Sequence, residues 1–230
     1  MDTNVAAGMT VKDPVSAKAK RLPFAMEDLK TIFGQDHGRY RSRDPELFWL
    51  PLLALYTGAR MTELGQALVR DIKKEQGVVY LDINSEEGGK SLKTASSKRY
   101  VPIHPELVRC GFLKYVAERR KAAKDESARL FPGLKPDSKG ILTVGFSKQF
   151  GYHLRVRLKI TDKRKTFHSF RHTFKDACRA AGIENVISDA LQGHSSGTVS
   201  GTYGTGYPLP VLAAAMAKVH YPGLDLKHFN

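Results

Sequence analysis

The sequence has few cysteines and no long apolar run, and both absences narrow the class of protein. Only Cys110 and Cys178 are present, too far apart to form a metal or redox motif, so a reduced, intracellular chain is expected. The longest apolar stretch, residues 48–56, contains Pro51 and is too short to span a membrane. The N-terminus lacks the apolar core of a secretory signal, which predicts a cytoplasmic protein.

The sequence also lacks a recognisable metal motif. His168 and His172 are four positions apart, as in a zinc pair, but no third ligand follows at a recognisable distance and there is no His-Glu-x-x-His motif. Carboxylates such as Asp176 and Glu184 are scattered rather than paired as a two-metal nuclease requires. We therefore expect neither a metal nor another cofactor.

What the sequence has in excess is positive charge. Its 37 Lys and Arg residues outnumber 23 Asp and Glu residues, which gives a net charge of +14 over 230 residues. An excess of this size predicts a polyanionic partner, with nucleic acid as the first candidate and an anionic membrane as the second. Residues 1–21 are polar and basic without periodicity, which predicts a disordered arm or linker remnant before one domain over 22–217 and a tail over 218–230.

The hydrophobic pattern predicts a mainly α fold with a small antiparallel β-sheet. Helices are expected after Pro23 up to Gly34 and over 45–56, 62–68, 105–123, 143–158, 166–181, 184–191 and 209–219. Asp44 and Pro45 mark a helix start, whereas Pro51 predicts a kink or a later start. Two β-prone runs, 77–83 and 99–103, flank a polar connection rich in Gly and Lys and predict a hairpin.

The segment 166–182 carries the strongest local pattern. Its Phe167, Phe170 and Phe174 form an apolar stripe, and His168 and Arg171 project side by side next to that stripe. Such a pair can hold one phosphate group. The alternative is an ordinary helix with a solvated basic face, which also includes His172 and Lys175.

A flexible stretch follows the sequence Leu-Gln-Gly-His at 191–194. Gly197, Ser200 and Gly201 separate His194 from Tyr203, as would suit a side chain that must move. Taken alone, Tyr203 is an ordinary packed or half-exposed tyrosine, and Tyr207 is an equal competitor.

Five motifs occur in a fixed order: TGAR at 57–60, SLKT at 91–94, HSFRH at 168–172, LQGH at 191–194, and Tyr203. Together they resemble the catalytic domain of the tyrosine recombinase or phage integrase family, over about residues 22–217. The segment RYVPIHPEL at 99–107 is similar to the strand and helix start that follow the family's hairpin. Gln192 departs from the family pattern, which more often has Leu there.

The resemblance implies six site residues. Arg60, His168 and Arg171 would bind the scissile phosphate, Lys93 would lie on the hairpin, His194 would support the phosphate or a proton transfer, and Tyr203 would be the nucleophile. Arginines suit the negative charge that builds on a phosphate under attack. A phenol with a pKa of about 10 needs a base, for which His168 is expected, and the leaving 5′ oxygen needs an acid, for which Lys93 is expected.

Two alternatives concern neighbouring residues. Lys90 and Lys98 lie in the same connection as Lys93, and all three could simply contact the DNA backbone. Glu63 follows Arg60 by three positions, close enough to orient its guanidinium. Two alternatives also exist for the terminal helix 209–219. It docks either on its own core or, as is common in the family, on a neighbouring protomer.

The implied function is site-specific DNA recombination through a 3′-phosphotyrosine intermediate, for integration or excision of a phage or other mobile element in a bacterial host. The implied partners are double-stranded DNA, further copies of the chain in a tetramer on DNA (with a monomer in isolation), and an accessory DNA-bending protein. A type IB topoisomerase and a DNA-binding module without catalysis are the alternatives, and the complete residue set argues against the second. Family members usually carry a helical DNA-binding domain before the catalytic one, so a fragment is one interpretation of this chain.

Overall fold

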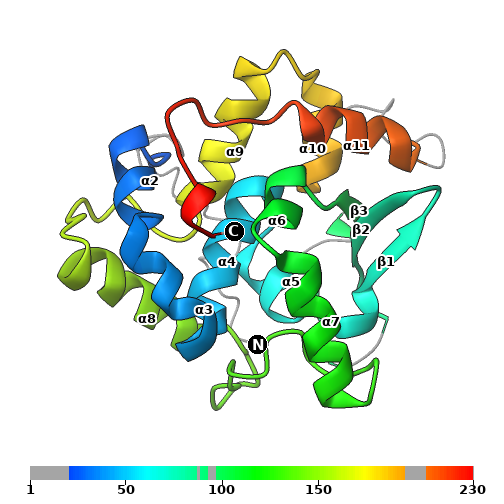
Figure 1. Ribbon diagram of the computed structural model, residues 1–230, viewed down its shortest axis with the longest axis horizontal. Helices are drawn as coiled ribbons and strands as arrows, with labels where there is room; N and C mark the ends of the chain where they lie inside the picture. The colour runs from blue at the N-terminus through cyan, green and yellow to red at the C-terminus, as the bar shows by residue number, and fades with distance from the viewer. Residues whose placement is uncertain (1–20, 87–88, 93–96, 195–205, 230) are drawn as a thin grey trace, which may run out of the picture.

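The computed structural model describes residues 21–86, 89–92, 97–194 and 206–229. Helix α4 lies near the middle, with other helices around it and a three-stranded sheet at one edge (Figure 1). The helices are α2 (Met26–Ile32), α3 (Tyr40–Arg43), α4 (Pro45–Thr57), α5 (Met61–Gly65), α6 (Pro105–Arg109), α7 (Phe112–Ala123), α8 (Val144–Tyr152), α9 (Ser169–Ala180), α10 (Asn185–Gln192) and α11 (Leu209–Ala217). Shorter 3₁₀ or π turns are η1 (Gln35–Arg39), η2 (Val69–Asp71), η4 (His153–Arg157) and η6 (Lys227–Phe229). The mainly α fold with a small sheet confirms the predicted fold class.

Helix α4 begins and ends where its sequence dictates. The Asp44 carboxylate accepts a hydrogen bond from the Leu47 amide at 3.0 Å, which caps the free first turn. The helix continues through Pro51, so the predicted later start is wrong. It ends at Gly58, whose φ of 62° is left-handed, and a Cβ there would lie 2.5 Å from Cδ1 of Phe174. Only glycine therefore allows α4 to end this close to α9.

Strands β1 (Ile72–Glu75), β2 (Val78–Ile83) and β3 (Arg99–Pro102) form the antiparallel sheet in that order. The pairing of β2 with β3 confirms the predicted hairpin, with Leu81 opposite Val101. Strand β1 was not predicted. Its centre is Lys73 and Lys74, which pair with Tyr80 and Val79 of β2, and an exposed edge strand of this kind carries no apolar alternation.

Two helices predicted as continuous are interrupted. The helix expected over 105–123 is divided into α6 and α7 at Gly111, whose φ of 86° ends the first helix. The helix expected over 143–158 changes from α8 to the π turn η4 at His153. The helix expected over 62–68 is also shorter, because α5 ends at Gly65.

The C-terminal segment packs on its own domain. Helix α11 contacts β2, β3 and α10, and the chain then crosses the molecule to lie near α2 and α3 (Figure 1). The Tyr221 hydroxyl donates to the Leu55 carbonyl of α4 at 2.5 Å. Phe229 is buried, with its ring centroid 5.1 Å from that of Phe48. Of the two expectations for the terminal helix, docking on its own core is the one seen in this chain.

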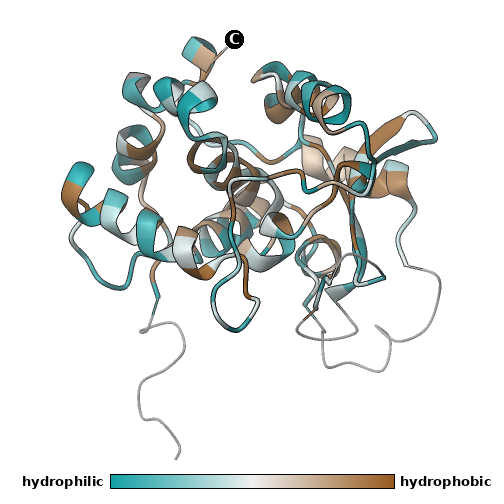
Figure 2. Cartoon of the chain, turned by 90° about the horizontal axis from the view of Figure 1, so that it is seen from below, coloured by the Kyte–Doolittle hydropathy of each residue, from teal (hydrophilic) through white to brown (hydrophobic). Residues whose placement is uncertain are grey.

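A single apolar core joins these elements. Its largest fully buried side chains are Trp49 and a set of phenylalanines that includes Phe33, Phe48, Phe112, Phe131, Phe150, Phe170 and Phe174. Most of the helices carry hydrophobic and hydrophilic residues together (Figure 2), whereas α4 is buried over almost its whole length. Across the described ranges, no helix is long and apolar enough to cross a membrane.

Candidate active site

Arg60 lies at the junction between α4 and α5 and is held by Glu63. The Glu63 carboxylate accepts 2.6 Å and 2.8 Å hydrogen bonds from Arg60 Nη1 and the Arg60 amide. Arg60 Nη1 also donates to Ser97 Oγ at 3.2 Å. The Glu63 side chain is 3% exposed and that of Arg60 is 20% exposed. The buried carboxylate therefore holds the guanidinium on its inner side, and part of the guanidinium remains accessible to solvent. The predicted pairing of Glu63 with Arg60 is confirmed.

The ionised form of Glu63 is favoured despite its burial. Burial alone would raise the pKa of this carboxyl, but the charge and hydrogen bonds of Arg99 and Arg60 outweigh that effect and lower the pKa below its usual value. Glu63 is therefore a carboxylate that two arginines share.

Arg171 lies in the first turn of α9 and is almost fully buried. Its Nη1 donates to the Gly58 carbonyl at 2.7 Å, which connects the helix to the glycine of the TGAR motif. Its Nη2 has no hydrogen-bond partner in the described part of the chain. Burial first, and then the charges of Arg60 and Arg99, lower the pKa of Arg171 to about 9. Arg171 is thus not part of a solvated basic face, and it retains a donor that an anionic oxygen would satisfy.

His168 occupies the N-cap position of α9, without a side-chain capping bond, and lies beside His172, with the two ring centroids 5.2 Å apart. Burial first, and then the charges of Arg21, His172, Arg171 and Arg60, lower the pKa of His168 to about 4. The imidazole is therefore neutral at neutral pH. A neutral imidazole can accept a proton.

His194 follows the end of α10, where Gly193 adopts a left-handed φ of 65°. Its Nδ1 lies 3.4 Å from Oδ1 of Asp189, and Lys175 Nζ donates to the same oxygen at 2.8 Å. Burial and the charge of Arg171 lower the pKa of His194, against the opposing effect of Asp189. The carboxylate therefore lies on the Nδ1 side of the ring.

The structure brings four of the six expected site residues into one electrostatic environment. After burial, the charges of Arg60 and Arg171 both contribute to the lowered pKa values of His168 and His194. Lys93 and Tyr203 lie outside the described residues. Tyr207, the competing tyrosine, is exposed.

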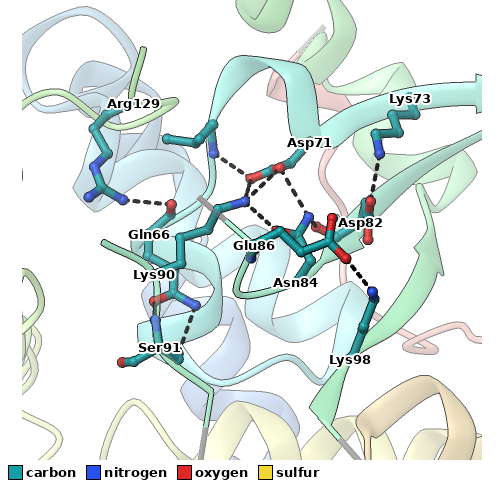
Figure 3. A network of polar contacts seen from close by, with 11 residues as sticks. Gln66, Asp71, Lys73, Asp82, Asn84, Glu86, Lys90, Ser91, Lys98 and Arg129 are labelled. Atoms are coloured by element: carbon teal, nitrogen blue, oxygen red, sulfur yellow. Dashed lines mark hydrogen bonds and ion pairs between the residues drawn. The ribbon is translucent and has the colours of Figure 1, made fainter. Parts of the chain in front are cut away.

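Lys90 and Lys98, the neighbours of Lys93, have different environments (Figure 3). Lys90 Nζ donates to Asp71 Oδ1 at 2.8 Å and to Asn84 Oδ1 at 2.7 Å, and its side chain is 3% exposed. The Lys98 side chain is more than half exposed and pairs with Glu86. Lys90 is therefore occupied inside the protein, and the expectation that all three lysines contact DNA does not fit it.

The chain next to Lys90 is also fixed. Gln66 Nε2 donates to the Ser91 carbonyl at 3.0 Å, and the Ser91 amide donates back to Gln66 Oε1 at 2.9 Å (Figure 3). At the other end of the connection, Ser97 is fully buried and contacts Arg60. Both flanks of residues 93–96 are thus attached to the domain.

Sequence reasoning missed two polar residues that connect this site. Arg99 bonds to Glu63 and to the end of α10, and Gln192 Nε2 donates to the Arg171 carbonyl at 2.8 Å. No local pattern marks Arg99 as a site residue. Gln192 did carry a signal, because it departs from the family pattern, and the structure shows that its side chain joins α10 to α9.

The remaining features do not form a second catalytic centre among the described residues. Within them, no three His, Cys, Asp or Glu side chains gather as a metal site would require. A cavity of about 370 Å³ is lined by residues such as Arg43, Glu46 and Phe146 and contains none of the candidate residues.

The family model described as the phage integrase family matches residues 28–205, and the chain belongs to this family, the tyrosine recombinases. The XerH site-specific recombinase, solved bound to its difH substrate as a pre-cleavage complex, has a similar fold: TM-score 0.51 and 18% identity, over 87% of this chain and 51% of that chain. The XerA recombinase gives a TM-score of 0.49 and 16% identity over 92% of this chain and 62% of that chain. This chain therefore spans about half the length of XerH. No curated protein matches it.

Proposed function

We propose that this chain is the catalytic domain of a site-specific DNA recombinase that cleaves and rejoins strands through a 3′-phosphotyrosine at Tyr203. The observation that carries the proposal is the shared environment of Arg60, Arg171, His168 and His194, in which buried Arg171 keeps an unpaired donor. A phosphodiester under attack gains charge on its non-bridging oxygens, and fixed guanidinium groups stabilise that state more than the ground state.

The proton transfers follow from the same residues. Neutral His168 accepts the proton of the Tyr203 hydroxyl as its oxygen attacks phosphorus. The bond from phosphorus to the 5′ oxygen breaks, and Lys93 donates a proton to that oxygen. His194 donates to the phosphate or takes part in the same transfer. An incoming 5′ hydroxyl then reverses the sequence on another strand, and since the phosphotyrosine conserves the energy of the broken bond, no ATP is consumed.

Double-stranded DNA is the proposed substrate. The XerH structure contains its difH substrate, and the net charge of +14 on this chain suits a duplex backbone. Backbone contacts provide affinity but little sequence choice. We further propose a tetramer on DNA, with an accessory DNA-bending protein, acting in integration or excision of a phage or other mobile element in a bacterial host.

The test is covalent trapping on nicked suicide duplexes drawn from a randomised library, so that the adduct selects its own target. The intact chain should form an adduct that is insensitive to EDTA, and Tyr203→Phe should form none, whereas Tyr207→Phe should still form one. An adduct that survives Tyr203→Phe but not Tyr207→Phe would move the nucleophile. Strict magnesium dependence, or site-independent relaxation of supercoiled plasmid, would contradict the proposal.

A further inference from the structure

Arg99, at the start of β3, makes three directional hydrogen bonds to three different parts of the domain. Its Nε donates to the Leu191 carbonyl at 2.7 Å, its Nη1 to the Ser97 carbonyl at 2.7 Å, and its Nη2 to Glu63 Oε2 at 2.8 Å. The side chain is 7% exposed. All three nitrogens of this guanidinium are therefore engaged inside the protein, and Arg99 is not available to a DNA phosphate.

The turn that carries His194 lies directly against Arg99. A Cβ on Gly193 would lie 2.6 Å from Arg99 Nη1, closer than real Cβ contacts allow, and Gly193 also has a left-handed φ of 65°. Arg99 thus holds the end of α10 through the Leu191 carbonyl and fills the space beside the residue that precedes His194. His194 is the next residue along the chain after Gly193.

Through Nη2, the Arg99 guanidinium is linked to Arg60 by the carboxylate that the two residues share, Glu63. Glu63 accepts from Arg99 Nη2 with Oε2 and from Arg60 Nη1 with Oε1, so one carboxylate fixes the spacing of the two arginines. Burial lowers the pKa of Arg99, and the charge of Glu63 opposes that shift. The end of α10 is joined to Arg171 as well, because Gln192 Nε2 donates to the Arg171 carbonyl.

We propose that Arg99 is a positioning residue that fixes His194 relative to Arg60 and makes no contact with DNA. This inference rests on the proposed function. The planar fork of arginine is needed, because lysine would place one point charge near Glu63 and could not bond to Leu191, Ser97 and Glu63 together. A catalytic constellation loses much of its rate when a supporting contact shifts it by about 1 Å.

The test is a double-mutant cycle between Arg99 and His194. Arg99→Lys should reduce the single-turnover rate of adduct formation on a saturating, library-selected suicide duplex by about 10- to 100-fold. In a His194→Ala background the same change should cost less than about 3-fold, since coupled residues are not additive. Duplex affinity, measured by fluorescence anisotropy, should change little. Equal losses in both backgrounds, or no loss, would overturn the proposal.

The control is Arg109→Lys, which alters an arginine paired with Glu106 on α6, outside the site. It should leave the cleavage rate unchanged. If Arg99→Lys does not fold, Gly193→Ala tests the same contact from the other side and should show the same dependence on His194.

A second readout separates this inference from the proposed function. The His194 ring signal in NMR spectra of the DNA-free protein should shift with Arg99→Lys and not with Arg109→Lys. If the intact chain forms no adduct with any library member, the proposed function fails, whereas this spectrum still decides whether Arg99 positions His194. An unchanged His194 signal would contradict the positioning role by itself.

Discussion

Lys90 Nζ lies 2.8 Å from Asp71 Oδ1, and both side chains are almost completely buried. Asp71 is itself fixed, because its Oδ2 accepts from the Leu68 amide at 2.7 Å. Lys90 lies in the connection between β2 and β3, and Asp71 lies in η2, which follows α5. The pair therefore joins these two segments. A buried pair of this kind is costly to break from one side, because the remaining charge has no water to solvate it.

Lys90→Met should therefore lower the free energy of unfolding by about 3–5 kcal/mol, measured by urea denaturation. Lys98→Met is the matched control, since Lys98 forms an exposed pair with Glu86 and its loss should leave the free energy of unfolding nearly unchanged. Adding Asp71→Leu to Lys90→Met should recover part of the loss, because no buried charge is then left unpaired. Equal effects of Lys90→Met and Lys98→Met would show that the pair is not buried in solution.

His168 should make stability depend on pH in a defined window. Its pKa falls from 6.5 to about 4 on folding, so between these values the unfolded chain binds more protons than the folded one. The contribution of His168 to the free energy of unfolding is fully present above pH 6.5 and is lost as pH falls toward 4.

The measurement is the free energy of unfolding as a function of pH for the intact chain and for His168→Gln. The variant should lose less stability between pH 6.5 and 4. The comparison must be a difference, because burial also lowers the pKa of His37, to about 3, and other histidines contribute in the same direction. Parallel curves for the two proteins would contradict a buried, neutral His168.

Local signals in the sequence were sufficient for features that depend on neighbouring residues. Asp44 caps α4 because the groups that it satisfies lie three positions away. The apolar run 48–56 lies in α4, which is buried over almost its whole length because the run has no polar face. Strand β1 was missed, since Lys73 and Lys74 form a strand only because β2 pairs with them.

Features that depend on distant contacts could not be predicted. Lys90 and Lys98 look alike in the sequence, yet only the fold buries one of them beside Asp71. Arg99 meets Leu191 across 92 positions, and no spacing rule covers that separation. The order of motifs indicates the candidate site residues, whereas the fold determines which neighbouring residues hold them.

The C-terminal segment should contribute to the stability of the monomer. Phe229 packs among Phe48, His37 and His228, and Arg41 donates to its carbonyl oxygen. Phe229→Ala should cost about 3–5 kcal/mol in urea denaturation. Removal of residues 218–230 should unfold the chain.

Val211→Ala is the control for Phe229→Ala, because Val211 lies on α11 but its side chain is 43% exposed. This change should alter the free energy of unfolding by less than about 0.5 kcal/mol. The alternative, docking on a neighbouring protomer, gives a different result. Phe229→Ala would then leave the stability of the monomer unchanged and weaken assembly on DNA, as measured by sedimentation.

The proposed acid, Lys93, can be tested by changing the leaving group. Lys93→Ala should slow adduct formation on an ordinary suicide duplex by about 10²–10⁴-fold, as expected for loss of a general acid. A duplex with a 5′-bridging sulfur should restore a rate near that of the intact chain, because a thiol with a pKa of about 8.5 leaves without a proton.

Two variants serve as controls. Lys98→Ala should form the adduct at a rate close to that of the intact chain on both substrates. Arg171→Lys should be slow on both, since it stabilises charge on phosphorus oxygens rather than on the leaving group. If Lys93→Ala is equally slow on both substrates, Lys93 binds phosphate and another group supplies the proton.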